Sequence, residues 1–139
     1  MSEWTFAMLK PETVRLGLIG KVIGILEERR LKIVAMKLIQ ITRKQAEKLY
    51  EMHRGKQFYS GLVNHILSGP VVVMVVKGNN VIKDLRKVAG VTDPAKAELG
   101  TIRGDYGISI NENIIHAADS PENAEREIKI FFRPDEILS

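Results

Sequence analysis

The sequence contains no cysteine among its 139 residues. This absence excludes a disulfide framework, a thiol nucleophile and a cysteine-ligated zinc or iron–sulfur site. A long apolar run is missing too, since Val71–Val76 is the longest and is far too short to span a bilayer. The segment Met1–Lys10 lacks the apolar stretch of a signal peptide. We therefore expect no membrane partner and a cytoplasmic location.

Several well-known motifs are absent as well. The chain has neither a GxGxxG fingerprint nor a GxSxG nucleophile elbow. Gly17–Lys21 resembles a P-loop only faintly, because the spacing is wrong and Val22 stands where a serine or threonine is needed. His53, His65 and His116 are too scattered for a metal site, and we expect His53 and His65 to face solvent or to satisfy local polar groups.

The composition is that of a folded globular protein, with 45% hydrophobic and 27% charged residues. The length fits a single domain over residues 1–139. Twenty-one Lys and Arg against 17 Asp and Glu leave a net charge of +4, and the isoelectric point is about 9.4. This balance favours an anionic partner, either phosphate or nucleic acid, but is too small to choose between them.

Apolar blocks and polar breaks alternate along the chain and predict its elements. The predicted strands are Trp4–Leu9, which Lys10 and Pro11 end, Leu31–Ile41, Val71–Val76 and Ile114–Ile115. The continuous β-branched run Val71–Val76 suits a strand buried on both faces. The predicted helices are Leu18–Leu26, Thr42–Tyr50, Phe58–Leu67, Val81–Val88 and a last one that begins at Ser120–Pro121. Thr42 with Gln45 forms a capping-box pattern, and Ser120 followed by Pro121 is typical of a helix start. Gly90–Asn113 has no clear period and is predicted to be a long loop.

This order reduces to βαββαβ, which predicts an α+β sandwich of the ferredoxin-like type. We expect an antiparallel four-stranded sheet with added helices and a long loop before the last strand. A doubly wound parallel sheet is the main rival. It is disfavoured because two short helices separate the second and third strands and because the last strand is very short.

His116 is the first candidate for chemistry. It lies where a strand ends and a capped helix begins, and helix N-termini attract phosphate through their unpaired N–H groups. An imidazole there can act as a nucleophile toward phosphorus, although spacing alone favours a hydrogen-bonded capping or core histidine. Glu127 lies about two helical turns after Ser120 and can face back to orient the ring. A solvent-facing glutamate is the alternative.

A second group of candidates could bind phosphate. Lys10 ends the first strand, Arg86 lies on the fourth predicted helix, and Arg103 and Thr92 lie in the long loop. One lysine and two arginines suit a polyphosphate, but each is also compatible with ordinary surface charge, and spacing does not show that they converge. Tyr50 and Phe58 flank a polar stretch, where an aromatic ring either stacks on a base or packs into the core.

Residues 113–120, with the sequence NIIHAADS, resemble the nucleoside diphosphate kinase signature, N-x-x-H-[GA]-S-D-[SA]. The resemblance extends from Thr5 to about Phe132. Its other matching segments are Phe6–Pro11, Phe58–Val63, Ser68–Val72, Arg86–Ala95 and Gly100–Tyr106. So many motifs in one order make this resemblance far more specific than a single pattern.

The resemblance implies Mg²⁺-dependent transfer of a γ-phosphoryl group from a nucleoside triphosphate such as ATP to a nucleoside diphosphate. The reaction is ping-pong, with a phosphohistidine at His116 that Glu127 orients. The residues implied to hold the phosphates are Lys10, Tyr50, Arg86, Thr92 and Arg103. The resemblance also implies that Asn113 and Lys10 contact the ribose 3′-hydroxyl. It implies that Phe58 stacks on the base and that Leu62 and Ile110 line the opposite wall.

The same resemblance implies that Mg²⁺ bridges the phosphates without direct side-chain ligands. It also implies a homo-oligomer, with a hexamer favoured through contacts of the long loop and a tetramer possible. The sequence departs from the family pattern at Ala118, where a serine usually contacts the helix carboxylate, and at Asp93, where an asparagine is usual. We expect Ala118 to change stability or rate modestly, because one neutral hydrogen bond contributes about 1 kcal/mol.

The alternative function is a nucleic-acid-binding or regulatory module that uses the ferredoxin-like sheet and the basic surface. Its weakness is that the predicted strands are aliphatic and lack the aromatic motif that such modules use to stack bases.

Overall fold

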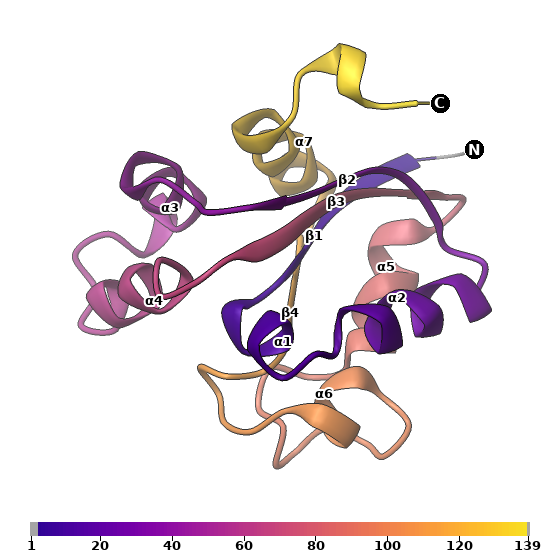
Figure 1. The fold of residues 1–139 in the computed structure, drawn as a ribbon, viewed down its shortest axis with the longest axis horizontal. Helices are drawn as coiled ribbons and strands as arrows, with labels where there is room; N and C mark the ends of the chain where they lie inside the picture. The colour runs from indigo at the N-terminus through magenta and orange to yellow at the C-terminus, as the bar shows by residue number, and fades with distance from the viewer. Residues whose placement is uncertain (1–2, 139) are drawn as a thin grey trace.

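The computed structural model describes residues 3–138. Its strands are β1 (Glu3–Leu9), β2 (Lys32–Ile39), β3 (Val71–Gly78) and β4 (Ile115–Ala117). Its helices are α1 (Pro11–Arg15), α2 (Ile19–Glu28), α3 (Arg43–Leu49), α4 (Tyr59–Ile66), α5 (Val81–Ala89), α6 (Ile102–Tyr106) and α7 (Pro121–Phe131). Short 3₁₀ helices occupy Glu51–His53 and Pro134–Glu136. Figure 1 shows α7 on one side of the sheet and α2 and α5 on the other.

The strands form one four-stranded sheet in the order β2-β3-β1-β4. The pairs β1–β3, β1–β4 and β2–β3 are antiparallel. The predicted α+β ferredoxin-like fold is confirmed, and the parallel alternative is wrong. Because β4 pairs with β1, His116 lies directly beside Met8 and close to the end of β1 that leads into Lys10.

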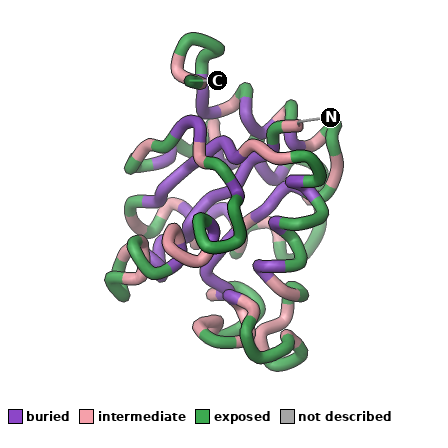
Figure 2. Tube along the Cα trace, turned by 90° about the vertical axis from the view of Figure 1, so that its right-hand side faces the viewer, coloured by how far each residue is buried: buried purple, intermediate pink, exposed green. Residues whose placement is uncertain are grey.

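The core lies on both faces of the two central strands. Every side chain from Thr5 to Leu9 and from Val71 to Val76 is buried, and Figure 2 shows this buried centre within an exposed shell. The predicted two-sided burial of β3 is therefore confirmed. Strands buried on both faces have little freedom to shift register, so they form a rigid base for the residues at their ends.

Both predicted helix starts are confirmed. The Thr42 hydroxyl accepts the Gln45 N–H at 3.1 Å, and the Gln45 side-chain oxygen accepts the Thr42 N–H at 3.0 Å. The Ser120 hydroxyl accepts the Asn123 N–H at 3.1 Å, with Pro121 in the first turn. These caps are local in sequence, and this is why they can be recognised without the fold.

Three expectations are corrected. Gly90–Asn113 is not an uninterrupted loop, because Thr101 caps α6 by accepting the Gly104 N–H. Pro11 does not only end β1; it occupies the first turn of α1, where its missing N–H costs nothing. The last strand begins at Ile115 rather than Ile114, and His116 lies within it, because Ile114 has a φ of 78° that a strand does not allow.

No helix within residues 3–138 combines the length and the apolar character needed to cross a membrane.

Gly90, which ends α5, provides a test of how the loop packs. It has a φ of 90°, and a Cβ atom there would lie 2.6 Å from the Thr101 hydroxyl. Gly100 has a similar φ of 94° but no atom within 4 Å of the same position. We expect Gly90→Ala to lower the free energy of unfolding by about 3 kcal/mol and Gly100→Ala by about 1 kcal/mol, since only the first adds overpacking to backbone strain. Urea unfolding of both variants measures the difference, and equal losses would contradict this packing.

Candidate active site

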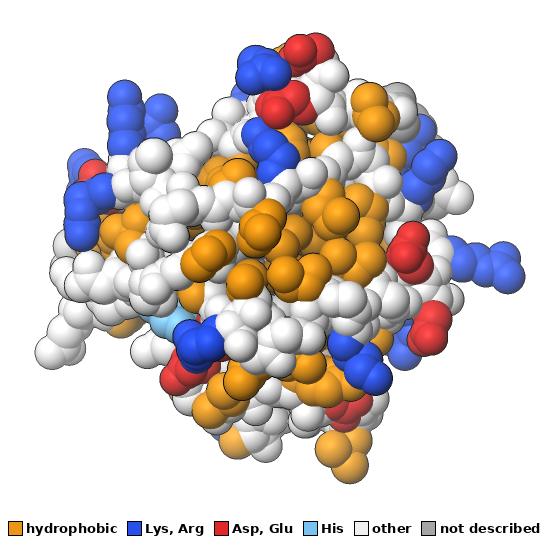
Figure 3. All heavy atoms as spheres, viewed as in Figure 1, with side chains coloured by type: hydrophobic (Ala, Val, Ile, Leu, Met, Phe, Trp, Pro, Cys, Tyr) orange, Lys and Arg blue, Asp and Glu red, His pale blue; other side chains and the backbone are white. Residues whose placement is uncertain are grey.

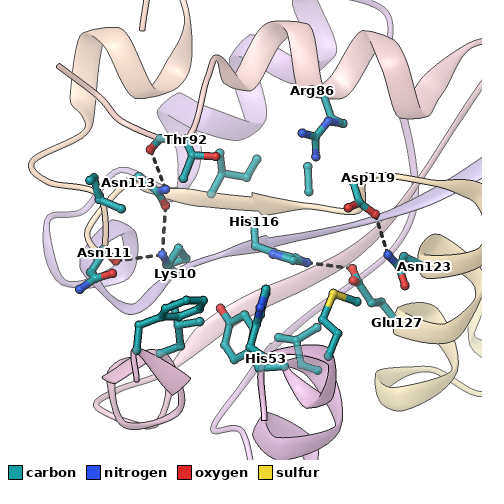
Figure 4. Close-up of a pocket in the computed structure, with 18 of the residues that line it drawn as sticks. Lys10, His53, Arg86, Thr92, Asn111, Asn113, His116, Asp119, Asn123 and Glu127 are labelled. Atoms are coloured by element: carbon teal, nitrogen blue, oxygen red, sulfur yellow. Dashed lines mark hydrogen bonds and ion pairs between the residues drawn. The ribbon is translucent and has the colours of Figure 1, made fainter. Parts of the chain in front are cut away.

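A cavity of about 570 Å³ opens at the end of the sheet where β1 leaves for α1 and β4 begins. Every residue that the sequence analysis assigned to the site lines this cavity: Lys10, Tyr50, Phe58, Leu62, Arg86, Thr92, Arg103, Ile110, Asn113, His116 and Glu127. The labelled side chains in Figure 4 come from segments far apart in the chain. The convergence that spacing alone did not show is therefore present in the fold.

His116 contacts a carboxylate at the floor of the cavity. Its Nε2 atom lies 2.8 Å from Oε1 of Glu127, which is buried on α7 with 3% of its surface exposed (Figure 4). An ionised carboxylate only accepts hydrogen bonds, so Nε2 carries the proton of a neutral ring. The lone pair is then on Nδ1. The bond to Glu127 thus selects the tautomer and the orientation of the imidazole.

The second oxygen of Glu127 lies 3.6 Å from the Arg126 guanidinium. Arg126 is itself held by the carbonyl groups of Lys48 and Leu49, at 2.7 and 3.3 Å. Ala118 offers no hydroxyl group to this carboxylate, but a guanidinium charge is close to the oxygen that His116 does not use. The modest effect expected for Ala118 stays a prediction.

Lys10 is almost fully buried, with 4% of its surface exposed. Its ammonium donates to Oδ1 of Asn113 at 3.0 Å and to the Asn111 carbonyl at 2.9 Å. Burial lowers the pKa of Lys10 to about 8, although the Glu12 carboxylate acts in the opposite direction, and the Arg103 charge lowers it further. The amide group of Asn113 donates to the Thr92 carbonyl at 3.0 Å, which fixes the side of Asn113 that faces Lys10.

The two arginines contribute charge in different ways. Arg86, on α5, is exposed and lies above His116 in Figure 4. Arg103 donates to the carbonyl groups of Gly90 and Ile115, each at 2.7 Å, and so ties α6 to the residue before His116. Burial and then the charge of Arg86 lower the pKa of Arg103 to about 10. The charge of Arg86 thus disfavours the charge of Arg103, and an anion between the two would relieve this repulsion.

Aromatic side chains form the mouth of the cavity. Phe58 precedes α4 and is 52% exposed, and its ring lies 5.2 Å from that of His53. Tyr50 is buried and meets the His116 ring edge-on at 6.3 Å. Burial and then the Glu127 charge raise the pKa of the Tyr50 hydroxyl, so Tyr50 keeps its proton and can donate it in a hydrogen bond.

Sequence reasoning missed further residues of the cavity. His53 lines it as well, which was not expected, although His53 also satisfies a local polar group as predicted, since its Nδ1 lies 3.4 Å from the Lys56 ammonium. No local pattern marks His53, because only the fold turns its 3₁₀ helix toward the cavity. Asp119 also lines the cavity, and a hydrogen bond from Asn123 lowers the Asp119 pKa despite partial burial. By contrast, His65 meets expectation, with Nε2 2.7 Å from the buried Glu12 carboxylate.

Comparison with known proteins gives one consistent result. The family model described as "Nucleoside diphosphate kinase" matches residues 3–137. The nucleoside diphosphate kinase of Archaeoglobus fulgidus is 56% identical over 99% of this chain and 91% of its own, and that of Methanocaldococcus jannaschii is 55% identical over 99% of both. A solved structure of the Halobacterium salinarum nucleoside diphosphate kinase, in complex with CDP, is 42% identical, with a TM-score of 0.96 over 100% of this chain and 93% of that one.

The chain belongs to the nucleoside diphosphate kinase family. The family, the fold class and the enzyme class inferred from the sequence are therefore confirmed. The similarity also spans the whole cavity, because its lining runs from Lys10 to Glu127 and the family model matches beyond both residues.

The lowered pKa of Lys10 predicts proton uptake when this kinase binds a nucleoside diphosphate. In the free enzyme Lys10 is mostly neutral above its pKa of about 8. A bound phosphate favours the ammonium form, so binding at about pH 8.5 should take up roughly 0.7 proton, and the uptake should vanish toward pH 7. Calorimetric titration with ADP in buffers of different ionisation enthalpy measures this uptake.

The matched control for this titration is Lys56→Gln, since Lys56 is an exposed lysine whose ammonium lies 5.7 Å from the Phe58 ring. Lys56→Gln should keep the uptake and Lys10→Gln should lose it. Equal uptake in the two variants would show that the proton goes elsewhere.

Proposed function

We propose that this kinase exchanges phosphoryl groups through His116. The γ-phosphoryl of a nucleoside triphosphate such as ATP moves to Nδ1 of His116 and then to a nucleoside diphosphate. The observation that supports this most directly is the 2.8 Å contact between Nε2 of His116 and buried Glu127, inside a cavity that also holds Lys10, Arg86 and Arg103. That contact leaves Nδ1 as the unprotonated ring nitrogen.

In the first half-reaction the lone pair of Nδ1 attacks the γ-phosphorus. The N–P bond forms as the bond between the γ-phosphorus and the β–γ bridging oxygen breaks, and the nucleoside diphosphate leaves with that oxygen. The Nε2–H stays on the ring, and Glu127 stabilises the positive charge that develops there. The second half-reaction reverses these changes with another nucleoside diphosphate as acceptor.

Charge stabilisation is the main task of the cavity, because phosphoryl transfer needs positioning and charge more than covalent work. We assign the phosphate contacts to Lys10, Arg86 and Arg103, with hydroxyl donors from Thr92 and Tyr50. Lys10 is suited to the oxygens nearest the ribose, because its ammonium is already 3.0 Å from Asn113. Asn113 and Lys10 would together contact the ribose 3′-hydroxyl.

We assign the base to the mouth of the cavity. Phe58 offers an exposed ring face, and Leu62 and Ile110 line the same cavity. Stacking is tolerant of base identity because every base has a π-face. The CDP in the related Halobacterium salinarum structure supports a nucleotide as ligand.

The cavity also fits Mg²⁺ carried on the phosphates. Residues 3–138 contain no group of three or more His, Asp or Glu that could hold a metal ion by themselves, and the charged residues of the lining are Lys10, Arg86 and Arg103 with Asp119 and Glu127. Such a lining suits Mg²⁺ whose main ligands are phosphate oxygens and waters. Asp119 is an exposed carboxylate that lines the same cavity. When bound, Mg²⁺ neutralises phosphate charge.

We further propose that residues 1–139 form one catalytic domain that assembles into a homo-oligomer, with a hexamer favoured over a tetramer. Exposed apolar side chains support self-association: Met36 and Leu38 on the edge strand β2, and Leu99 and Ile108 on the long loop, are 50–88% exposed. Figure 3 shows hydrophobic side chains gathered in the middle of the face on which β2 runs in Figure 1. A cytoplasmic location remains a prediction from the sequence.

The alternative, a nucleic-acid-binding module, gains no support from the sheet. Such modules stack bases on an exposed sheet face, whereas the side chains of β1 from Thr5 and of β3 to Val76 are buried on both faces. Nucleic-acid binding therefore stays a secondary possibility that depends on the basic surface alone.

The phosphohistidine can be tested with labelled ATP. The wild-type kinase should form an adduct that is labile in acid and stable in base, and His116→Ala should form none. Exchange should fall at least about 1,000-fold in His116→Ala, because the nucleophile is lost. His53→Gln is the matched control and should still become labelled, since His53 has no carboxylate partner comparable to Glu127. Undiminished exchange in His116→Ala would rule out the proposed reaction.

The base site can be tested with Phe58→Ala. Loss of stacking should lower kcat/KM by about tenfold or more for purine and pyrimidine nucleoside diphosphates alike. Phe58→Tyr should keep the wild-type values, and thermal unfolding should change little because Phe58 is already half-exposed. A loss confined to one class of base would contradict stacking as the mode of recognition.

A further inference from the structure

A left-handed turn precedes the reactive histidine. Ile114 has a φ of 78°, which is a rare conformation for a β-branched residue. The N–H of Ile115 donates to the Asn113 carbonyl at 2.9 Å, so residues 113–115 form a γ-turn. Such a turn is strained and persists only where its surroundings hold it. Because β4 starts at Ile115, this turn determines the direction in which the strand leaves and where His116 points.

The first turn of α1 holds both ends of Ile114. The N–H of Ile114 donates to Oε2 of Glu12 at 3.0 Å. The Ile114 carbonyl accepts the Thr13 hydroxyl at 2.6 Å and the Lys10 N–H at 2.9 Å. Glu12, Thr13 and Ile114 are each fully buried, with 0% of their surface exposed, so water cannot replace these contacts.

Glu12 is itself anchored on its other oxygen. Its Oε1 atom lies 2.7 Å from Nε2 of His65, on α4. Burial alone would favour the protonated acid, but the hydrogen bonds from His65 and from the Ile114 N–H keep the pKa of Glu12 below its usual range. The carboxylate is therefore an ionised acceptor with both oxygens in use. The partners of this carboxylate, His65 and the Ile114 N–H, lie outside the cavity lining.

We propose that Glu12 and Thr13 are positioning residues, which hold the strained peptide of Ile114 and thereby aim His116 at the phosphate. This inference rests on the proposed function of His116. Neither side chain lines the cavity, so both act through the turn rather than on the nucleotide. The effect of the turn should therefore appear in the transfer step and not in nucleotide affinity, because the turn changes only the position of Nδ1 relative to phosphorus. The variants are compared at about pH 6, because the Glu12 charge raises the Lys10 pKa and Lys10 must stay protonated when that charge is removed.

Glu12→Ala removes both contacts of the carboxylate. We expect the rate constant for phosphorylation of His116 by Mg·ATP to fall by about 100-fold, the loss typical of a misplacement of about 1 Å. The dissociation constant for ADP should change by less than about twofold, since equal binding and slower transfer are the signature of a positioning defect. Rapid-quench single-turnover kinetics and calorimetry give the two quantities.

Glu12→Gln separates position from charge. A carboxamide oxygen can still accept the Ile114 N–H, and its NH₂ group can donate to a neutral His65 ring. Glu12→Gln should therefore restore at least about one-third of the wild-type rate constant, as a rescue by geometry requires. If Glu12→Gln is as slow as Glu12→Ala, the charge next to Lys10 matters rather than the turn, and the proposal is overturned.

If Glu12→Ala does not fold, Thr13→Val tests the positioning role independently. It removes only the hydroxyl that donates to the Ile114 carbonyl, and we expect a loss of about tenfold in the transfer step with unchanged ADP affinity. The matched control is Thr5→Val on β1, where the buried hydroxyl has no hydrogen-bond partner among residues 3–138. Thr5→Val should transfer phosphate at the wild-type rate.

The proposal is overturned if Thr13→Val behaves like Thr5→Val, or if its loss of rate is matched by a loss of ADP affinity. If the wild-type kinase itself forms no acid-labile adduct, the proposed function fails and this inference fails with it. A wild-type adduct combined with unaffected variants would overturn the positioning role alone.

Discussion

The hydrogen bond between His116 and Glu127 depends on how strand β4 and helix α7 are placed relative to each other. His116 lies on β4, at one edge of the sheet, and Glu127 lies on the helix that covers one face of it. The distance of 2.8 Å requires that α7 packs firmly on β1, and the Phe6 and Phe131 rings stack at 5.2 Å to hold it there. Phe6 also lies 6.0 Å from the His116 ring. Core packing therefore sets the geometry of the reactive side chain.

The cations of the cavity oppose folding and favour binding. Burial lowers the pKa of Lys10 and of Arg103, and in each case a neighbouring arginine adds to the effect. These groups lose bound water when the chain folds. Hydrogen bonds to carbonyl oxygens and to the Asn113 amide replace that water only in part. A polyphosphate bound as proposed would relieve this repulsion. The site is thus organised before the ligand arrives, as electrostatic catalysis requires.

Structural features that depend only on residues close together in the sequence could be predicted from local patterns. The Thr42 and Ser120 caps, the buried run of β3 and the strand–helix order all come from residues within one or two turns of each other. The cavity residues were predicted from a motif resemblance, and periodicity alone could not have joined them. The turn at Ile114 escaped prediction, because its cause is a set of contacts with a segment distant in sequence, such as the contact with Glu12 some hundred residues away.

These long-range contacts have a consequence for folding. Lys10, Glu12 and Thr13 near one end of the chain must meet Asn113 and Ile114 near the other before the histidine is in place. Closing so long a loop costs conformational entropy. The chain loses this entropy before the contacts between its two ends can stabilise it. The buried β1–β3 pair can form first, since it provides the fully buried centre of the sheet on which β4 docks. A chain that has formed this pair but not docked β4 would have a hydrophobic core and no site. The strained turn at Ile114 therefore couples the completion of the sheet to the placement of the proposed nucleophile.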